Sequence, residues 1–150
     1  MIKENLKLKG DVTLTLTDKN GKLKDKKEIK NLVVNAGLSF ITSRMLGTSK
    51  AVMSHMALGS GSSAANANDT SLGSQVGSRE ALDSASETST GVITFASTFE
   101  PGDATGALTE AGIFNASSGG DMLCRTVFSG TVTKASTDTL AITWSITVAV

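Results

Sequence analysis

The chain has 150 residues, of which 39% are hydrophobic and 19% charged, and its formal net charge at pH 7 is zero. This length and this composition are typical of one globular domain that buries a hydrophobic core without needing disulfide bonds or metal ions. The single cysteine, Cys124, excludes an internal disulfide. No apolar run approaches the roughly 20 residues of a membrane-spanning helix. The lack of tyrosine and the single tryptophan, Trp144, argue against an aromatic platform for sugars or single-stranded nucleic acid.

Charge is divided unevenly along the chain. Residues 1–30 hold nine lysines and five acidic residues, whereas residues 31–150 hold five basic and nine acidic residues. We therefore expect a basic N-terminal hairpin or arm, over about residues 1–30, on a mildly acidic body. Its candidate partner contacts are Lys22, Lys24, Lys26 and Lys27. The alternative is that these lysines only keep a solvated strand edge soluble.

The first two predicted strands form this hairpin. Residues 6–17 alternate, with Val12, Leu14 and Leu16 on one face, which predicts a strand with one buried side. Asp18–Gly21 is a turn signal that contains the pair Asn-Gly, and residues 22–34 return as a second strand. The first half of this second strand is charged, so we expect the tip of the hairpin to project.

One short helix is predicted near residues 36–46. Its four apolar positions, Leu38, Ile41, Met45 and Leu46, recur at helical spacing. We expect Asn35 to cap the N-terminus of the helix and Gly47 to follow its last turn.

The middle of the chain alternates short strands with loops of small residues. We expect strands at residues 52–58, 78–82 and 91–99, with a Ser/Thr-rich turn after residue 82 and a turn at 100–103. The long segment after residue 58 is predicted to be an exposed, mobile loop. Its candidate exposed residues are Gly59, Ser60, Gly61, Asn66 and Asn68.

Residues 108–128 predict a second hairpin, made of strands 108–114 and 122–128 around a turn rich in Asn, Ser and Gly. Because neighbours in a strand point to opposite faces, we expect Cys124 in the core and Arg125 at a surface or interface.

The last segment, residues 139–150, has the clearest alternation in the chain. Its large apolar residues share one face: Leu140, Ile142, Trp144, Ile146 and Val148. We expect this strand to cross the centre of a sheet. The elements together predict an all-β fold, an antiparallel β-sandwich of jelly-roll type with one short helix, in a single domain over residues 1–150. The pattern leaves the strand order open.

Residues that carry chemistry are few and scattered. His55 is the only histidine, and it lies between methionines, where a structural role is expected. Gly59-Ser60-Gly61 lacks both the spacing of a nucleophile elbow and the Lys-Ser/Thr ending of a phosphate loop. Glu100, Asp103 and Glu110 are isolated acids. The sequence therefore predicts no catalytic, cofactor-binding or metal-binding residues, and a protein that is not an enzyme.

Residues 108–128, with the runs Thr109-Glu-Ala-Gly-Ile-Phe-Asn115 and Met122-Leu-Cys-Arg-Thr-Val-Phe128, resemble a pattern of tailed-bacteriophage virion proteins. Two further stretches fit the same pattern, residues 31–38 and residues 56–61 with 69–72. The resemblance implies a virion structural protein, assembled in the host cytoplasm and located in the virion.

Three roles follow from this resemblance. The first is a capsid decoration, or cement, protein that binds the outside of the head shell and bridges coat subunits, with the major capsid protein and copies of itself as partners. The second is a tail fibre, baseplate or collar component, with tail or baseplate proteins as partners. The third is receptor binding through the loop at residues 59–77. No cofactor, small-molecule substrate, membrane or direct nucleic-acid contact is expected.

Overall fold

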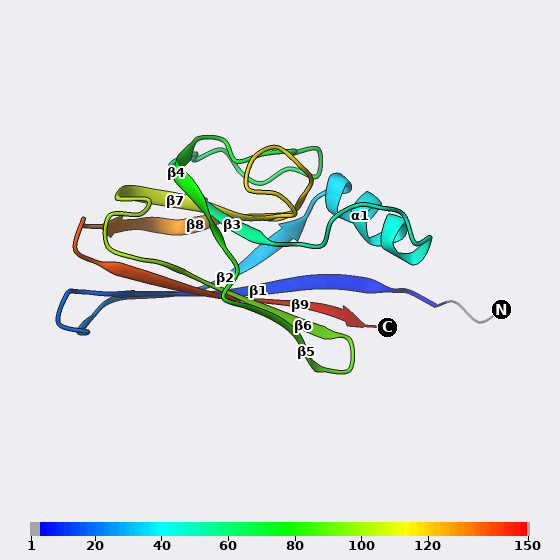
Figure 1. Cartoon of the computed structure of the whole chain (residues 1–150), viewed down its shortest axis with the longest axis horizontal. Helices are drawn as coiled ribbons and strands as arrows, with labels where there is room; N and C mark the ends of the chain where they lie inside the picture. The colour runs from blue at the N-terminus through cyan, green and yellow to red at the C-terminus, as the bar shows by residue number, and fades with distance from the viewer. Residues whose placement is uncertain (1–3, 150) are drawn as a thin grey trace.

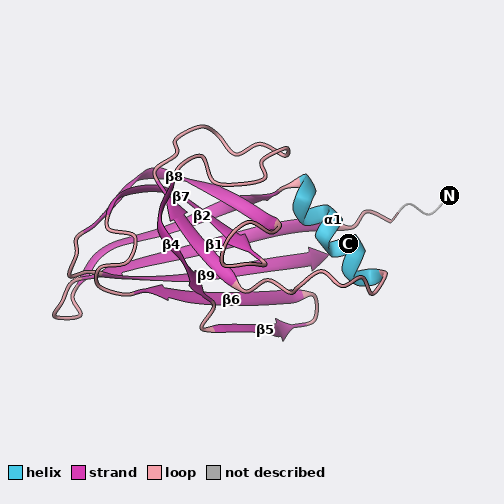
Figure 2. Ribbon diagram, turned by 45° about the horizontal axis from the view of Figure 1, so that its top comes forward, coloured by secondary structure: helices cyan, strands magenta, loops and turns pink. Residues whose placement is uncertain are grey.

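The structure, a computed structural model that describes residues 4–149, is an antiparallel β-sheet protein with one helix (Figure 2). The strands are β1 (Lys7–Thr17), β2 (Leu23–Val33), β3 (His55–Gly59), β4 (Gln75–Ala81), β5 (Ser84–Ser89), β6 (Val92–Phe99), β7 (Gly106–Phe114), β8 (Met122–Lys134) and β9 (Thr139–Ala149). The helix, α1, spans Asn35–Met45. The predicted all-β class with one short helix is confirmed.

The nine strands form two layers that share one strand. Their order is β4-β3-β7-β8-β2-β1-β9-β6-β5. In Figure 1, β3, β4, β7 and β8 make the upper layer, and β1, β5, β6 and β9 make the lower layer. Most of β2 pairs with β1, but Leu32 and Val33 at its end pair with Arg125 and Cys124 of β8. The two layers are therefore halves of one sheet that folds over at β2.

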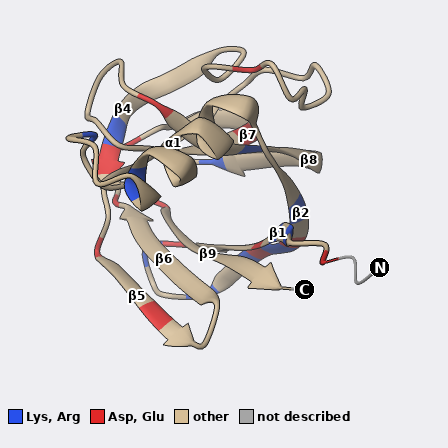
Figure 3. Cartoon of the chain, turned by 90° about the vertical axis from the view of Figure 1, so that its right-hand side faces the viewer, with Lys and Arg blue, Asp and Glu red and all other residues tan. Residues whose placement is uncertain are grey.

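Viewed from its end, the folded sheet resembles an incomplete barrel with α1 at its mouth (Figure 3). Opposite β2, the chain crosses from β4 in the upper layer to β5 in the lower layer. Backbone hydrogen bonds hold this crossing at both ends, from Leu82 N–H to Ser54 and from Asp83 N–H to Ala96. The edge strands β4 and β5 are thus connected by the short segment between them and not by hydrogen bonds between the two strands.

The hydrophobic core lies between the layers, and β9 is central to it. β9 pairs with β1 on one side and with β6 on the other. Leu140, Ile142, Trp144 and Ile146 are buried, which confirms the predicted alternation and the position inside a sheet. Because β1 lies between β2 and β9, the N-terminal hairpin is part of the lower layer and not a separate arm; only its turn lies at the end of the molecule (Figure 1).

That turn is built by its own polar residues. Asp18 Oδ1 accepts hydrogen bonds from the backbone N–H of Asn20 at 2.8 Å and of Lys22 at 3.0 Å. Gly21 has φ +80°, a conformation that glycine adopts without the steric cost of a side chain. The local sequence therefore fixes the hairpin's register.

Helix α1 packs through only part of the face that the spacing predicted, because Ile41 packs against the core but Leu38 is 43% exposed. Gly37 and Phe40 are its buried residues, whereas Met45 is 83% exposed and Leu46, just after the helix, is 82% exposed. The N-cap residue is Val34, not Asn35, and it makes no side-chain capping bond. The expectation that Asn35 caps the helix is therefore wrong.

The close packing of α1 on β8 depends on Gly37. A Cβ at this position would lie 2.1 Å from the backbone oxygen of Leu123, which cannot move freely. We expect Gly37→Ala to destabilise the fold by about 1–3 kcal/mol, although alanine favours helices. Chemical denaturation of this variant measures the change. The exposed Ser39→Ala in the same helix is the control, and equal stability of the two variants would contradict the packing argument.

The segment after residue 82 was predicted as a turn, which is wrong. Residues Ser84–Ser89 form β5, whose six residues are all exposed, and which pairs with β6 as the last strand of the sheet. β8 extends to Lys134, six residues beyond the predicted end. In both cases the strand lacks the apolar alternation on which the prediction relied.

Candidate partner-binding surfaces

The long loop between β3 and β4 is held by a buried carboxylate. Glu110, in β7, is fully buried, and its Oε1 accepts hydrogen bonds from the backbone N–H of Gly61 and Ser74, each at 2.8 Å. Its Oε2 accepts one from Gly73 N–H at 2.9 Å and one from Arg125 Nε at 2.8 Å. A Cβ on Gly61 would lie 2.4 Å from this carboxylate, so glycine permits the close approach.

Arg125 completes this network and is 2% exposed. Its Nη1 pairs with Asp69 Oδ2 at 2.8 Å, and its Nη2 donates to the backbone oxygen of Ser63 at 3.0 Å. The expectation that Arg125 lies at a surface or interface is therefore wrong. Arg125 lies on the outer face of β8 in the upper layer, and the loop between β3 and β4 covers that face.

The carboxylate of Glu110 stays charged in this setting. Burial alone would raise its pKa, but hydrogen bonds from Ser74, Gly73, Arg125 and Gly61 hold that pKa below its ordinary value of 4.5. The pKa of Asp69 is lowered as well, by a backbone hydrogen bond from Asn66 and by Arg125.

A carboxylate whose pKa is lower in the folded than in the unfolded chain stabilises the fold at higher pH, and this contribution is lost as the pH falls. We therefore expect the melting temperature to drop as the pH falls below about 4.5. Glu110→Gln should be less stable at neutral pH and show a flatter pH profile. Calorimetry from neutral to acidic pH checks this, and equally steep profiles for both proteins would contradict it.

The loop surface is exposed at three of the five predicted positions. Ser60, Asn66 and Asn68 are exposed, whereas Gly61 is half-buried and Gly59, at the end of β3, is buried. The expectation of exposure is wrong for Gly59, because β3 is paired on both sides.

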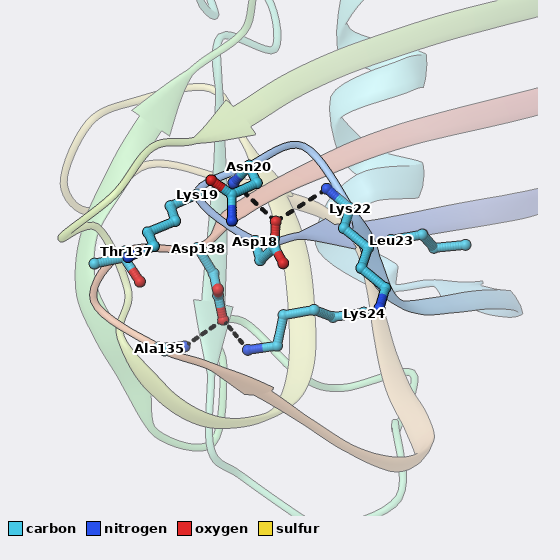
Figure 4. Close-up of a pocket in the computed structure, with 9 residues that line it drawn as sticks. All are labelled: Asp18, Lys19, Asn20, Lys22, Leu23, Lys24, Ala135, Thr137 and Asp138. Carbon is cyan, nitrogen blue, oxygen red and sulfur yellow. Dashed lines mark hydrogen bonds and ion pairs between the residues drawn. The ribbon is translucent and has the colours of Figure 1, made fainter.

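The predicted basic contacts lie on β2 and at the turn that precedes it. A pocket of about 560 Å³ lies at this turn, and its lining includes Lys19, Lys22 and Lys24 (Figure 4). Lys24 Nζ pairs with Asp138 Oδ2 at 2.5 Å, which ties the hairpin to the β8–β9 loop. Lys22 is exposed beside it.

The other two predicted lysines differ in exposure. Lys26 is exposed on the outer face and lies 3.9 Å from Glu28 Oε1. Lys27 lies opposite Leu14 and is half-buried. The turn and the outer face of β2 therefore leave Lys19, Lys22 and Lys26 exposed, although Lys26 also forms a long ion pair with Glu28, whereas Lys24 is held by Asp138.

An apolar groove of about 820 Å³ lies at the other end of the molecule, between α1 and the inner face of the lower layer. Its walls include Phe40, Ile41, Phe95, Leu123 and Ile146. Two of its lining residues carry opposite charges: Arg44 on α1 and Glu87 on β5. Neither forms an ion pair with another side chain within residues 4–149.

The rim of this apolar groove exposes large apolar side chains. Met45 at the end of α1, Val52 and Ile93 of β6 line the groove and are 83%, 59% and 40% exposed. The neighbouring Leu46, which does not line it, is 82% exposed. Contiguous apolar surface beside a hollow is characteristic of interaction sites. β5, which contributes to one wall, also presents an unpaired strand edge without lysine or proline to block pairing.

The residues predicted to have structural roles lie apart from this groove. Cys124 is buried in the core, as predicted, and burial raises the pKa of its thiol well above the usual range. His55 is half-buried, with Nδ1 2.8 Å from Ser54 Oγ. Over residues 4–149, no three His, Cys, Asp or Glu side chains gather into a metal-binding group. The one helix of this part of the chain is too short to cross a membrane.

No family model, curated protein or solved structure matches this chain. The candidate surfaces therefore depend on its own geometry. Sequence reasoning missed the apolar groove, although Met45 and Leu46 were visible as apolar residues at the end of the predicted helix. It also missed the buried ion pair between Glu110 and Arg125. The signal for it was an acidic residue, Glu110, in an otherwise apolar strand.

Proposed function

We propose that this chain is a non-enzymatic structural protein of a bacteriophage virion, a decoration protein that binds the outside of the head shell and bridges coat subunits. The observation that carries the proposal is the apolar groove with its exposed rim, because a surface of this kind is normally covered by a partner. The resemblance of residues 108–128 to tailed-phage virion proteins supplies the setting.

The distribution of the two surfaces supports a bridging role. The basic turn and helix α1, which forms one wall of the apolar groove, lie at opposite ends of the long axis of the molecule (Figure 1). A chain with two separate contact surfaces can join two neighbours. On a lattice, many weak contacts of this kind act together, so that each one alone need not be strong. In this proposal the turn, with Lys19 and Lys22, contacts acidic coat protein.

A tail fibre, baseplate or collar component is the second candidate. It is favoured by the strand Glu110-Ala-Gly-Ile-Phe114, since related patterns occur in tail-fibre domains. Its partners would be tail or baseplate proteins. The exposed part of the loop, with Asn66 and Asn68, would then be the surface available to a receptor.

The proposal is tested by adding the purified chain to phage particles that lack it. We expect saturable binding to heads and a higher temperature of head opening. Replacing Lys22 and Lys26 by glutamate should weaken binding by roughly tenfold or more and reduce its salt dependence. Lys9→Glu, a matched exposed change at the far end of β1, should leave binding unchanged.

Two outcomes of this experiment would contradict the decoration role. Binding to tails alone would assign the chain to the second candidate. Absence of binding to heads and tails would overturn both virion roles.

A further inference from the structure

The end of the molecule that carries α1 has a hollow, which is the apolar groove itself, and beside it a projection that is also apolar. The hollow is lined mainly by aliphatic and aromatic side chains. The projection is the end of α1, where Met45, which also lines the hollow, and its neighbour Leu46 are 83% and 82% exposed. Both involve α1, which lies at the mouth of the incomplete barrel in Figure 3. A two-fold axis through this end of the molecule would place each projection in the other copy's hollow.

The charges of the apolar groove fit the same arrangement. Arg44 lies on the α1 wall, and Glu87 lies on the β5 wall. Arg44 Nη1 donates to the backbone oxygen of Lys50 at 3.0 Å, and Glu87 Oε1 accepts from Gly91 N–H at 3.0 Å, so each is oriented by the backbone. Under a two-fold axis, Arg44 of one copy can meet Glu87 of the other, and the pair occurs twice.

We infer that the apolar groove and its rim form a symmetric interface with a second copy of this chain. The end of α1 of each copy is seated in the apolar groove of the other, and two reciprocal Arg44–Glu87 pairs flank it. A small apolar molecule in the groove would contact Met45 and Val52, which line it, but would leave the exposed Leu46 beside them in water, whereas a second copy covers the groove and Leu46 together.

This arrangement deepens the proposed function, because it assigns one of the two surfaces to self-association. The basic turns of the two copies would then lie at the far ends of the dimer, since the turn and α1, which forms one wall of the groove, lie at opposite ends of each chain (Figure 1). Such a dimer presents two separated basic contacts, which is the geometry that bridging requires. The inference itself is tested on the purified chain alone, so it can fail while the binding to phage heads holds, and the reverse.

The test uses two variants with one charge reversed in each. Arg44→Glu has two acidic groups in the apolar groove, and Glu87→Arg has two basic groups. In a symmetric dimer, each variant alone places like charges together, whereas one copy of each restores both pairs. We expect light scattering after size-exclusion chromatography to show a dimer for the parent, weaker dimers by roughly tenfold or more for each variant, and a restored dimer for their mixture.

A matched pair of leucine-to-aspartate substitutions tests whether the end of α1 is part of the interface. Leu46→Asp should give a monomer that still unfolds cooperatively, because Leu46 is exposed in the single chain. Leu23→Asp places the same change on an exposed leucine near the basic turn and should leave the dimer intact. A parent chain that is monomeric at all concentrations would overturn the inference. A dimer that Leu46→Asp does not weaken would also overturn it. So would a mixture of Arg44→Glu and Glu87→Arg that associates no more tightly than either variant alone.

Discussion

A chain that ends at Ser136 is expected not to fold. The deletion removes β9, which pairs along its length with β1 and with β6. It also removes four buried apolar side chains, Leu140, Ile142, Trp144 and Ile146. At about 1.5–3 kcal/mol for each, their burial is comparable with the 5–15 kcal/mol that stabilises a typical domain. The two strand ladders are lost in addition.

Circular dichroism and thermal melting of the truncated chain measure this effect. We expect no cooperative transition and little soluble protein. Within the full chain, Trp144→Ala should cost about 3–5 kcal/mol, because the indole is buried and donates to Asn31 Oδ1 at 2.9 Å. Thr143→Ala, on the exposed side of the same strand, should change stability by less than about 0.5 kcal/mol. A truncated chain that melts cooperatively would contradict the central position of β9.

Arg125→Ala is expected to be the most destabilising single change among the charged residues. It leaves the buried carboxylate of Glu110 without its ionic partner and removes the donor to Asp69 and to the backbone of the loop. Breaking one side of a buried ion pair typically costs about 3–5 kcal/mol, because an uncompensated charge stays buried. The loop over residues 59–77 should lose its attachment first.

A double-mutant cycle separates this pair from its surroundings. Glu110→Gln with Arg125→Met removes both charges, so it should be less destabilising than the sum of its single changes. Denaturant unfolding gives the free energies, and limited proteolysis within residues 59–77 reports the loop. Additive effects, or a loop that stays protected in Arg125→Ala, would contradict the role of the network.

The alternation of apolar residues predicted the strands that form the centre of the lower layer. β1 and β9 place one face in the core and one in water, so their period of two is visible in the sequence. β5 was missed for the opposite reason. An edge strand that buries no side chain needs no apolar alternation, and its Ser- and Thr-rich sequence resembles a turn. The packing face of α1 depends on Gly37, which carries no hydrophobic signal.

The candidate site was only partly predictable. The hairpin of β7 and β8 was predicted, but which of its two faces another segment covers depends on the whole chain. Gly112 pairs with Arg125, which puts Glu110 and Arg125 on the same face. Burial of that face comes from the β3–β4 loop, so the expectation of an exposed Arg125 failed for a tertiary reason. The apolar groove likewise arises between α1 and strands that are distant in sequence.

The copy number of this chain in purified phage particles tests the central claim most directly. Quantitative mass spectrometry against the major capsid protein measures it. A decoration protein predicts hundreds of copies, in a simple ratio to the coat subunits. About six, twelve or eighteen copies would place the chain at the tail or at a vertex, and its absence from the particle would contradict a virion role altogether.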